Sequence, residues 1–418
     1  MKAILVSASL KNSKEDNLKT SLAELSRLAE TAGITPVATL EARRQKWDPS
    51  TFIGQGKAEE IKNLATENGA ELVIFDEELA PAQQRNLEKF FGGIAISTRT
   101  RIIIDIFSQR ARTREGRLQA QLAELSYELT RLTGKGLGMD QQHGMIGGRG
   151  AGEKKKEYDR RTLRGKIGDL KSKIDEIRRE RTVQRSARNS VPLPQIAIVG
   201  YTNAGKSTFL NAITKNRHGI YADDKLFATL DPSTKRVKLP SGGEALFTDT
   251  VGFIQRLPHQ LVAAFRSTLE EIHYCDAILH VHDYSSPDAK MQHESVKATL
   301  REIDVKDIPI INVFNKCDAV QDRLSAWAPV SLRPIFVSAL TGEGIPELLL
   351  KCEDVLSLRW KEYTEFIPQD GKGLVNFLYS CCMVKNTEYV QDGVRITFRA
   401  TDENYNRFKK RVEETQEK

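Results

Sequence analysis

The sequence has no apolar run that is both long enough and free enough of charge to span a bilayer. Cysteine is scarce, and it forms neither a C-x-x-C pair nor an even disulfide framework. Residues 1–10 contain a short apolar run but no convincing cleavage region, so they predict a first β-strand rather than a signal peptide. These absences favour a soluble, cytoplasmic chain without a membrane span. We expect reduced core thiols at Cys275, Cys317, Cys352, Cys381 and Cys382.

Basic charge is concentrated in one stretch of the chain. The formal net charge is +7 over 418 residues, and residues 153–188 hold 14 Lys or Arg against 7 Asp or Glu. The rest of the chain is therefore close to neutral. A concentrated basic stripe indicates attraction to nucleic acid, with a solvated helix face as the alternative.

Residues 1–110 alternate short apolar runs with helix-like segments, which predicts a small α/β domain with a mostly parallel sheet. The expected strands are 3–6, 36–40, 72–75 and 94–96, and the expected helices are 17–32, 58–67 and 81–90. Gly54, Gln55, Gly56 and Lys57 resemble a phosphate loop but lack the Ser or Thr and the full spacing. A tight turn into a helix explains them at least as well.

Two further helical segments carry the apolar spacing of a coiled-coil seam, in steps of four and three. The seams are Leu118, Leu122, Leu125, Leu129 and Leu132, and Leu163, Ile167, Leu170, Ile174 and Ile177. Between them, residues 134–153 contain eight glycines in twenty residues, which no regular element tolerates. We expect an antiparallel helical hairpin over residues 111–189 with a glycine-rich tip at 134–153. The tip is either a finger that enters a narrow, RNA-lined cavity or a floppy solvent loop.

Two more domains follow the hairpin. Pro192 and Pro194 block continuation of the second helix, and we place the third domain at residues 195–362. Residues 365–418 predict a helix at 373–382, a β-hairpin at 383–399 and a basic C-terminal helix. This last region is expected to be a small α+β domain.

One stretch fits the Walker A pattern G-x-x-x-x-G-K-S, after the apolar residues 195–199 and before the helix-like residues 208–213. Glycines let backbone N–H groups point at an anion, and the following helix adds the positive end of its dipole. Lys206 can reach the β and γ phosphates, and the Ser207 hydroxyl can hold Mg²⁺. The predicted cradle comprises Gly200, Tyr201, Thr202, Asn203, Ala204, Gly205, Lys206, Ser207 and Thr208.

Two downstream motifs select the base. Asn315, Lys316 and Asp318 form N-K-x-D directly after a strand-like run. A carboxylate there accepts hydrogen bonds from N1–H and the 2-amino group of guanine, and adenine has neither donor. The companion loop on the other side of the base is Ser338, Ala339 and Leu340. The sequence therefore predicts GTP and GDP as the ligands.

A fourth motif, D-x-x-G, is formed by Asp249, Thr250, Val251 and Gly252. Asp249 would orient Mg²⁺ through water, and the Gly252 N–H would sense the γ-phosphate. A threonine between the Walker A motif and D-x-x-G should complete the switch. Thr229 and Thr234 are both candidates, and spacing does not choose between them. Four motifs in order, each behind a predicted strand, indicate a guanine-nucleotide switch in a P-loop GTPase domain.

The position after D-x-x-G holds Phe253, where the Ras pattern has a water-orienting glutamine. An apolar side chain cannot orient water, so slow intrinsic hydrolysis is predicted. The missing group would come from a partner, from a rearranged switch or from a bound monovalent ion. Asn203 in the P-loop has an amide oxygen that could help to coordinate K⁺.

His280 and His282 alternate along an apolar run and should share one face of a strand. No further ligand cluster accompanies them in the sequence. We therefore expect ordinary strand residues rather than a metal site.

The chain resembles the HflX family of translation-associated GTPases, related to the Obg-type enzymes, over nearly all of its length. The resemblance is carried by residues 51–57, by 112–119 with the leucines up to 132, by the glycine-rich loop, by 227–231 and by 249–254. It implies that Thr229 is the Mg²⁺ ligand beside Ser207 and that Lys206, Thr229 and Gly252 carry catalysis. It adds Phe227, Ala228, Thr229, Leu230 and Asp231 to the nucleotide site.

The resemblance also implies a stress-linked factor that binds the large ribosomal subunit and its rRNA in the GTP form. Such a factor separates ribosomes into subunits, and the ribosome stimulates its GTP hydrolysis. Family members place the N-terminal domain and the hairpin near the peptidyl transferase centre. This chain departs from the family pattern at the tip, where Lys154, Lys155 and Lys156 replace the usual Thr-Gln-Leu. We expect a monomer.

Two other classes of function fit the same motifs. One is a GTP-dependent RNA-remodelling or RNA-modifying protein, although the sequence shows no distinct active-site cysteine or second cofactor motif. The other is a non-catalytic, GTP-switched regulatory binding protein. Slow hydrolysis would suit that role, but the basic hairpin would then have no purpose.

Overall fold

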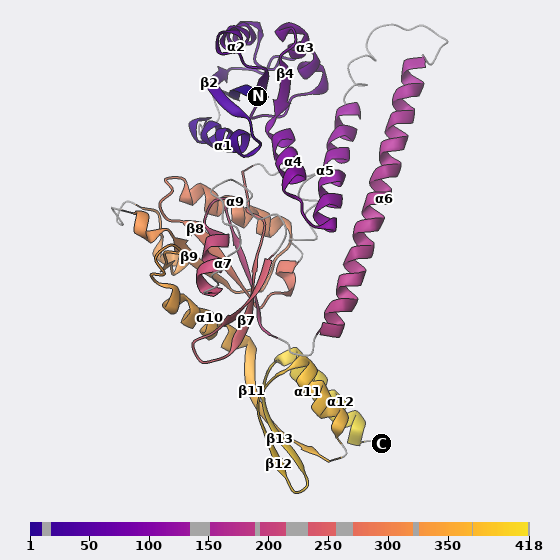
Figure 1. Ribbon diagram of the computed structural model, residues 1–418, viewed down its shortest axis with the longest axis vertical. Helices are drawn as coiled ribbons and strands as arrows, with labels where there is room; N and C mark the ends of the chain where they lie inside the picture. Colours follow the sequence, from indigo (N-terminus) through magenta and orange to yellow (C-terminus); the bar gives the residue numbers. More distant parts are fainter. Residues whose placement is uncertain are drawn as a thin grey trace. The chain divides into compact units, whose positions relative to one another are not determined.

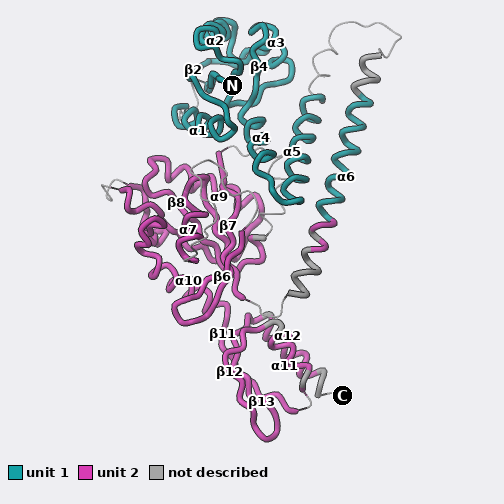
Figure 2. Tube along the Cα trace, viewed as in Figure 1, with its two compact units in different colours: residues 1–175, 223–231, 256–266 teal, residues 176–222, 232–255, 267–418 magenta. Residues whose placement is uncertain are grey.

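The computed structural model describes residues 1–10, 18–133, 151–188, 193–214, 233–255, 271–320, 326–369 and 371–416. These residues form two compact units (Figure 2). The N-terminal unit comprises the described residues up to Asp175, and the C-terminal unit comprises those from Glu176 onward.

The N-terminal unit contains a four-stranded sheet in the order β2-β1-β3-β4, in which every neighbouring pair is parallel. Its elements are β1 (Lys2–Leu10), α1 (Leu18–Thr31), β2 (Thr35–Arg44), α2 (Gln55–Asn68), β3 (Leu72–Phe75), α3 (Pro81–Phe91) and β4 (Ala95–Thr98). The expected first strand and the alternating α/β order are confirmed. Gly54 has a φ of 82° and precedes α2 directly, so this glycine makes the tight turn into the helix.

Helix α4 (Arg99–Arg110) is not among the helices expected from the sequence, and a buried ionic network fixes its first residue. Arg99 Nη1 lies 2.5 Å from Asp76 Oδ1, and Arg99 Nη2 pairs with Glu24. Ser21 Oγ donates to the other oxygen of Asp76 at 2.5 Å. The network therefore joins α4, the end of β3 and α1 inside the unit.

The helical hairpin is formed by α5 (Arg114–Thr133) and α6 (Ala151–Arg188), which lie side by side and antiparallel (Figure 1). The centre of the predicted seam is confirmed, because the following apolar residues form one cluster: Leu118, Leu122, Leu125, Ile167, Leu170 and Ile174. Of the expected tip at 134–153, residues 134–150 lie outside the described residues, and residues 151–153 belong instead to the first turn of α6.

The C-terminal unit contains a six-stranded sheet in the order β10-β9-β8-β5-β7-β6, which is parallel except for the β6–β7 pair. Its elements are β5 (Gln195–Gly200), α7 (Lys206–Thr214), β6 (Ser233–Lys238), β7 (Glu244–Asp249), β8 (Ala277–Asp283), α9 (Ala289–Glu302), β9 (Ile310–Asn315), β10 (Ile335–Phe336) and α10 (Ile345–Arg359). Carboxyl ends of parallel strands form the usual ligand edge of such a sheet. All four described nucleotide motifs follow β5, β7, β9 or β10 at that edge.

A three-stranded antiparallel sheet in the order β11-β13-β12 ends the chain. It is formed by β11 (Trp360–Pro368), α11 (Lys372–Cys381), β12 (Met383–Val390), β13 (Gly393–Thr401) and α12 (Asp402–Gln416), and α11 packs beside α12 (Figure 1). The expected hairpin and both helices are confirmed. Strand β11 spans the expected boundary at 362–365.

The fold class predicted from the sequence is confirmed: along the chain, an α/β domain with a helical hairpin is followed by a mostly parallel P-loop domain and then by an α+β domain. The helices of the described residues include none with the length and apolar character needed to cross a bilayer. The thiols of Cys275, Cys317, Cys352 and Cys382 are buried as expected, whereas the side chain of Cys381 lies outside the described part. Burial raises the pKa of Cys352 to about 12.

Candidate guanine-nucleotide site

The P-loop leaves β5 at a point where only glycine fits. A Cβ on Gly200 would lie 2.3 Å from the carbonyl oxygen of Val281 on the neighbouring strand β8. Asn203 and Gly205 have φ values of 61° and 85°, in the left-handed region that glycine and asparagine adopt most readily. The chain then enters α7 at Lys206. The loop is therefore a tight backbone turn into a helix N-terminus, as a phosphate cradle requires.

Lys206 is buried against the backbone of its own loop. Its Nζ donates to Gly200 O at 3.2 Å and to Tyr201 O at 2.9 Å. Burial lowers the pKa of Lys206 to about 8, and the nearby carboxylate of Asp249 raises it and offsets part of that effect. The amine is thus held over the loop with its charge only partly compensated.

Ser207 and Asp249 lie next to each other although they come from different motifs. Ser207 Oγ donates to Asp249 Oδ2 at 2.6 Å, and the Asp249 side chain is fully buried at the end of β7. A hydroxyl and a carboxylate are hard oxygen donors of the kind that Mg²⁺ prefers. These two residues therefore fit the predicted Mg²⁺ site.

The D-x-x-G segment is fastened to the P-loop by backbone hydrogen bonds. Thr202 N donates to Phe253 O at 2.8 Å, and Phe253 N donates to Gly200 O at 3.1 Å. A Cβ on Gly252 would lie 2.8 Å from the Thr202 methyl group and 3.0 Å from Lys206 Nζ. Glycine is therefore required there, and any movement of this segment is transmitted directly to the P-loop.

The Phe253 side chain is only 2% exposed, so it packs in the interior. It offers no polar atom to a water molecule. Thr250 is also committed to the fold, because its Oγ1 donates to Ile198 O at 2.7 Å. Neither side chain is available to activate water in this arrangement.

Asn315 connects three loops of the site. Its Nδ2 donates to Ala204 O in the P-loop at 2.9 Å, and its Oδ1 accepts from Ala339 N at 3.0 Å. A Cβ on Gly205 would lie 2.3 Å from Asn315 Nδ2, so the glycine makes room for this bridge. The phosphate loop and the two base loops are therefore held together by one side chain.

The two loops predicted to select the base are ordered by contacts of their own. Lys316 has a φ of 65°, and its Nζ donates to Asp283 Oδ2 at 2.7 Å. Asp318 is exposed at the turn after β9, where its carboxylate can accept hydrogen bonds from a base. Ser338 Oγ accepts from Thr341 N at 3.1 Å and so orders the companion loop.

Not all predicted site residues can be placed. Phe227, Ala228, Thr229, Leu230 and Asp231 lie outside the described residues. The other candidate threonine, Thr234, lies in β6 and shares a hydrogen bond of 2.9 Å with the Thr248 hydroxyl of β7. Thr234 is therefore part of the sheet.

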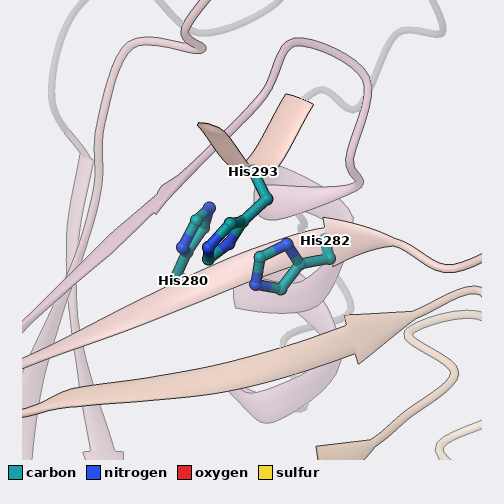
Figure 3. A group of neighbouring side chains, drawn as sticks. All are labelled: His280, His282 and His293. Atoms are coloured by element: carbon teal, nitrogen blue, oxygen red, sulfur yellow. The ribbon is translucent and has the colours of Figure 1, made fainter. Parts of the chain in front are cut away.

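One expectation at the histidines is corrected by the structure. The sequence suggests no companion ligand for His280 and His282, but α9 packs on β8 and brings His293 beside them (Figure 3). Burial is the first cause that lowers the pKa of each ring, to about 4 for His282. Only the helix–strand packing reveals this third residue, because it is separated from the pair in the sequence.

Family comparisons agree with this site. Four family models match consecutive segments, and they are described as GTP-binding GTPase N-terminal (19–108), GTP-binding GTPase Middle Region (110–188), 50S ribosome-binding GTPase (195–316) and HflX C-terminal domain (326–418). GTPase HflX of Lacrimispora saccharolytica is 44% identical over 394 residues, which are 94% of this chain and 92% of that protein. The chain belongs to the HflX family of GTPases.

The chain is also similar to a second HflX relative and to a solved GTP-binding protein. GTPase HflX of Caldanaerobacter subterraneus subsp. tengcongensis is 40% identical over 402 residues, which are 96% of this chain and 91% of that protein. A GTP-binding protein from Sulfolobus solfataricus, solved in complex with GDP, covers 86% of this chain and 99% of its own at 22% identity, with a TM-score of 0.44. The resemblance to HflX seen in the sequence is confirmed by the family models and the HflX relatives. The chain is therefore a GTPase of that family.

Proposed function

We propose that this HflX-family GTPase binds the large ribosomal subunit and its rRNA in the GTP form and separates ribosomes into subunits under stress. The observation that carries the proposal is the match of residues 195–316 to a model described as 50S ribosome-binding GTPase. The protein would act as a monomer in the cytoplasm.

The net positive charge of residues 153–188, most of which lie in α6, supports an RNA partner. The exposed cations of α6 include Arg161, Arg164, Lys166, Lys171 and Lys173, and they alternate with exposed carboxylates such as Asp169 and Asp175. Clustered cations bind a phosphate backbone by releasing its counterions, so the interaction should weaken as salt rises. The helix therefore has the electrostatic character of an rRNA contact.

Within the nucleotide site, we assign Mg²⁺ to Ser207 directly, to Thr229 directly and to Asp249 through water. Mg²⁺ would neutralise charge that develops on the phosphates during transfer. Lys206 would bind the β and γ phosphates, and the Gly252 N–H would meet the γ-phosphate. The commitment of Thr234 to the β6–β7 pair supports Thr229 as the switch threonine.

Intrinsic hydrolysis is proposed to be slow and to be stimulated by the ribosome. The support is the buried Phe253, which stands where a water-orienting side chain would otherwise be. If the ribosome supplies the missing group, hydrolysis would set the moment at which the protein is released from the ribosome. It would not serve as a metabolic step.

K⁺ is the alternative source of the missing catalytic group, and Asn203 would supply an oxygen ligand to it. Hydrolysis by the free protein should then be faster in KCl than in NaCl, and the difference should vanish in Asn203→Ala. Equal rates of the wild type in both salts would remove K⁺ from the mechanism.

Co-sedimentation with ribosomes tests the main proposal. A non-hydrolysable GTP analogue should enrich the protein on the large subunit relative to GDP and shift intact ribosomes toward free subunits. Ribosomes should also accelerate GTP turnover, and Lys206→Ala should abolish the difference between analogue and GDP. No enrichment over GDP together with no stimulation of turnover would falsify the proposal, and enrichment without subunit release would exclude the splitting step.

A further inference from the structure

Three histidine rings from two elements lie together behind the P-loop. His280 and His282 are two residues apart on β8, and His293 is on α9. Their ring centroids are 3.9 Å apart for His280 and His282, and 5.2 Å and 5.3 Å from these two to His293. One nitrogen from each ring lies within 4.8 Å of the others, and Figure 3 shows the three rings grouped side by side.

The hydrogen bonds around the cluster orient one ring. Asn312 Nδ2 donates to Leu332 O at 3.0 Å, which turns the amide oxygen toward His282. His282 Nε2 lies 3.3 Å from that oxygen, so Nε2 carries the proton and Nδ1 carries the lone pair. A metal-binding histidine commonly has such a partner on its second nitrogen.

The part of the chain that the structure describes holds no hydrogen bond to the other two rings, and the nearest carboxylate oxygen, Glu294 Oε1, lies 4.0 Å from His293 Nε2. His293 Nδ1 is buried there without any hydrogen-bond partner. The side chains of His280 and His293 are buried like that of His282, with 3%, 6% and 4% of each residue exposed. A buried polar atom without a partner costs free energy, and a cation bound by the lone pairs would remove that cost.

Aromatic packing is the competing explanation. His282 stacks on Phe314 with ring centroids 4.5 Å apart, and Trp327 lies 5.2 Å from His293. Such packing accounts for the burial of the rings. It does not account for the buried Nδ1 of His293, since an apolar side chain would fill the same space without an unpaired polar atom.

We propose that His280, His282 and His293 bind one transition-metal ion of the Zn²⁺ class. Three neutral imidazoles are a ligand set that Zn²⁺ accepts, with a fourth position left for water or another group. Metal–nitrogen bonds of about 2.0–2.1 Å require the three ligand nitrogens, which now lie within 4.8 Å of one another, to move closer together. This site is distinct from the Mg²⁺ site, because it contains no carboxylate or hydroxyl ligand.

The position of the site adds a link to the nucleotide. His280 pairs in register with Val199, the residue before Gly200 of the P-loop. A bound divalent cation would therefore fix the strand that supports the P-loop.

Competition for Zn²⁺ with a chromophoric chelator tests the proposal, on metal-stripped protein held in excess Mg²⁺ and GDP. The wild type should bind Zn²⁺, and His293→Gln should weaken that affinity by about 100-fold or more. Asn312→Leu, which removes the partner of His282 Nε2 together with the hydrogen bond to Leu332 O, should weaken it by about 10- to 100-fold. His273→Gln, an exposed histidine, is the matched control and should leave the affinity unchanged.

GDP binding by each variant verifies that its nucleotide domain is folded. Zn²⁺ affinity equal in the wild type and in a folded His293→Gln would overturn the proposal. Co²⁺ provides a measurement that needs no variant, because tetrahedral nitrogen ligation gives much stronger visible absorption than the hydrated ion. A Co²⁺ spectrum that stays octahedral would also overturn it and would leave an aromatic cluster in its place.

Discussion

Lys206 is held by two backbone carbonyls of its own loop, a position from which its amine can face a phosphate. We expect Lys206→Ala to lower affinity for a non-hydrolysable GTP analogue by about 100-fold, because charge-assisted hydrogen bonds contribute about 1.5–3 kcal/mol. The loss for GDP should be smaller. Equilibrium titration measures both, with Lys351→Ala, an exposed lysine of α10, as the control. Unchanged analogue affinity in Lys206→Ala would contradict the cradle assignment.

The pKa of Lys206 makes nucleotide binding depend on pH. Burial lowers this pKa from 10.5 to about 8, and a phosphate beside Nζ would raise it again. Binding at pH 8 should take up about half a proton, and affinity should fall as pH rises above 8. Calorimetry in buffers of different ionisation enthalpy measures the uptake, which should be absent in Lys206→Ala.

The lowered pKa of Lys206 also makes the free energy of unfolding depend on pH. The unfolded lysine, with a pKa near 10.5, holds its proton between pH 8 and 10.5 while the folded one loses it. The unfolded state then binds more protons, so this group's contribution to the free energy of unfolding rises with pH across that window.

At this scale, motif spacing predicts which residues form the nucleotide site but not how they connect. The N-K-x-D pattern identifies Asn315, yet its bridge from Ala204 to Ala339 depends on the spatial order of the strands. The sequence does not predict that His293 joins His280 and His282, for a related reason. His293 is polar and lies in a helix whose packing the sequence does not specify.

Among the elements, α4 depends on a buried ion pair. Removal of Arg99 would leave the Asp76 carboxylate buried and uncompensated, which typically costs about 3–5 kcal/mol. We expect Arg99→Leu to lower the free energy of unfolding of the N-terminal unit by that amount. Arg101→Leu breaks a partly exposed pair with Asp105 and Glu124 and should cost less than about 1 kcal/mol. Urea unfolding of both variants measures the difference, and equal losses would contradict this account.

Apolar periodicity predicts the parallel strands, the hairpin seam and the C-terminal β-hairpin, because each has one buried face or a fully buried run. It does not predict α4, whose first residue is a buried arginine satisfied only by groups distant in sequence. It also does not predict β11, because alternate residues of that strand are exposed and its pairing with β13 is long-range.

For the whole molecule, three consecutive lysines near the start of α6 should set the affinity for the ribosome. Replacement of Lys154, Lys155 and Lys156 by alanine should weaken association and reduce the slope of log affinity against log salt, by up to about 0.9 for each phosphate that is no longer neutralised. GTP hydrolysis by the free protein should not change. Sedimentation over a range of salt measures the slope, and an unchanged slope would show that the cluster is a solvated face.

The bridge made by Asn315 has a consequence for nucleotide exchange. Because one amide ties the phosphate loop to both base loops, the base and phosphate ends of a bound nucleotide are not released independently. Each end that binds pre-organises the other, so fragments of the nucleotide should bind far more weakly than their separate contacts suggest. Exchange of GDP for GTP is then a single opening event, and a partner could accelerate it by displacing this one side chain.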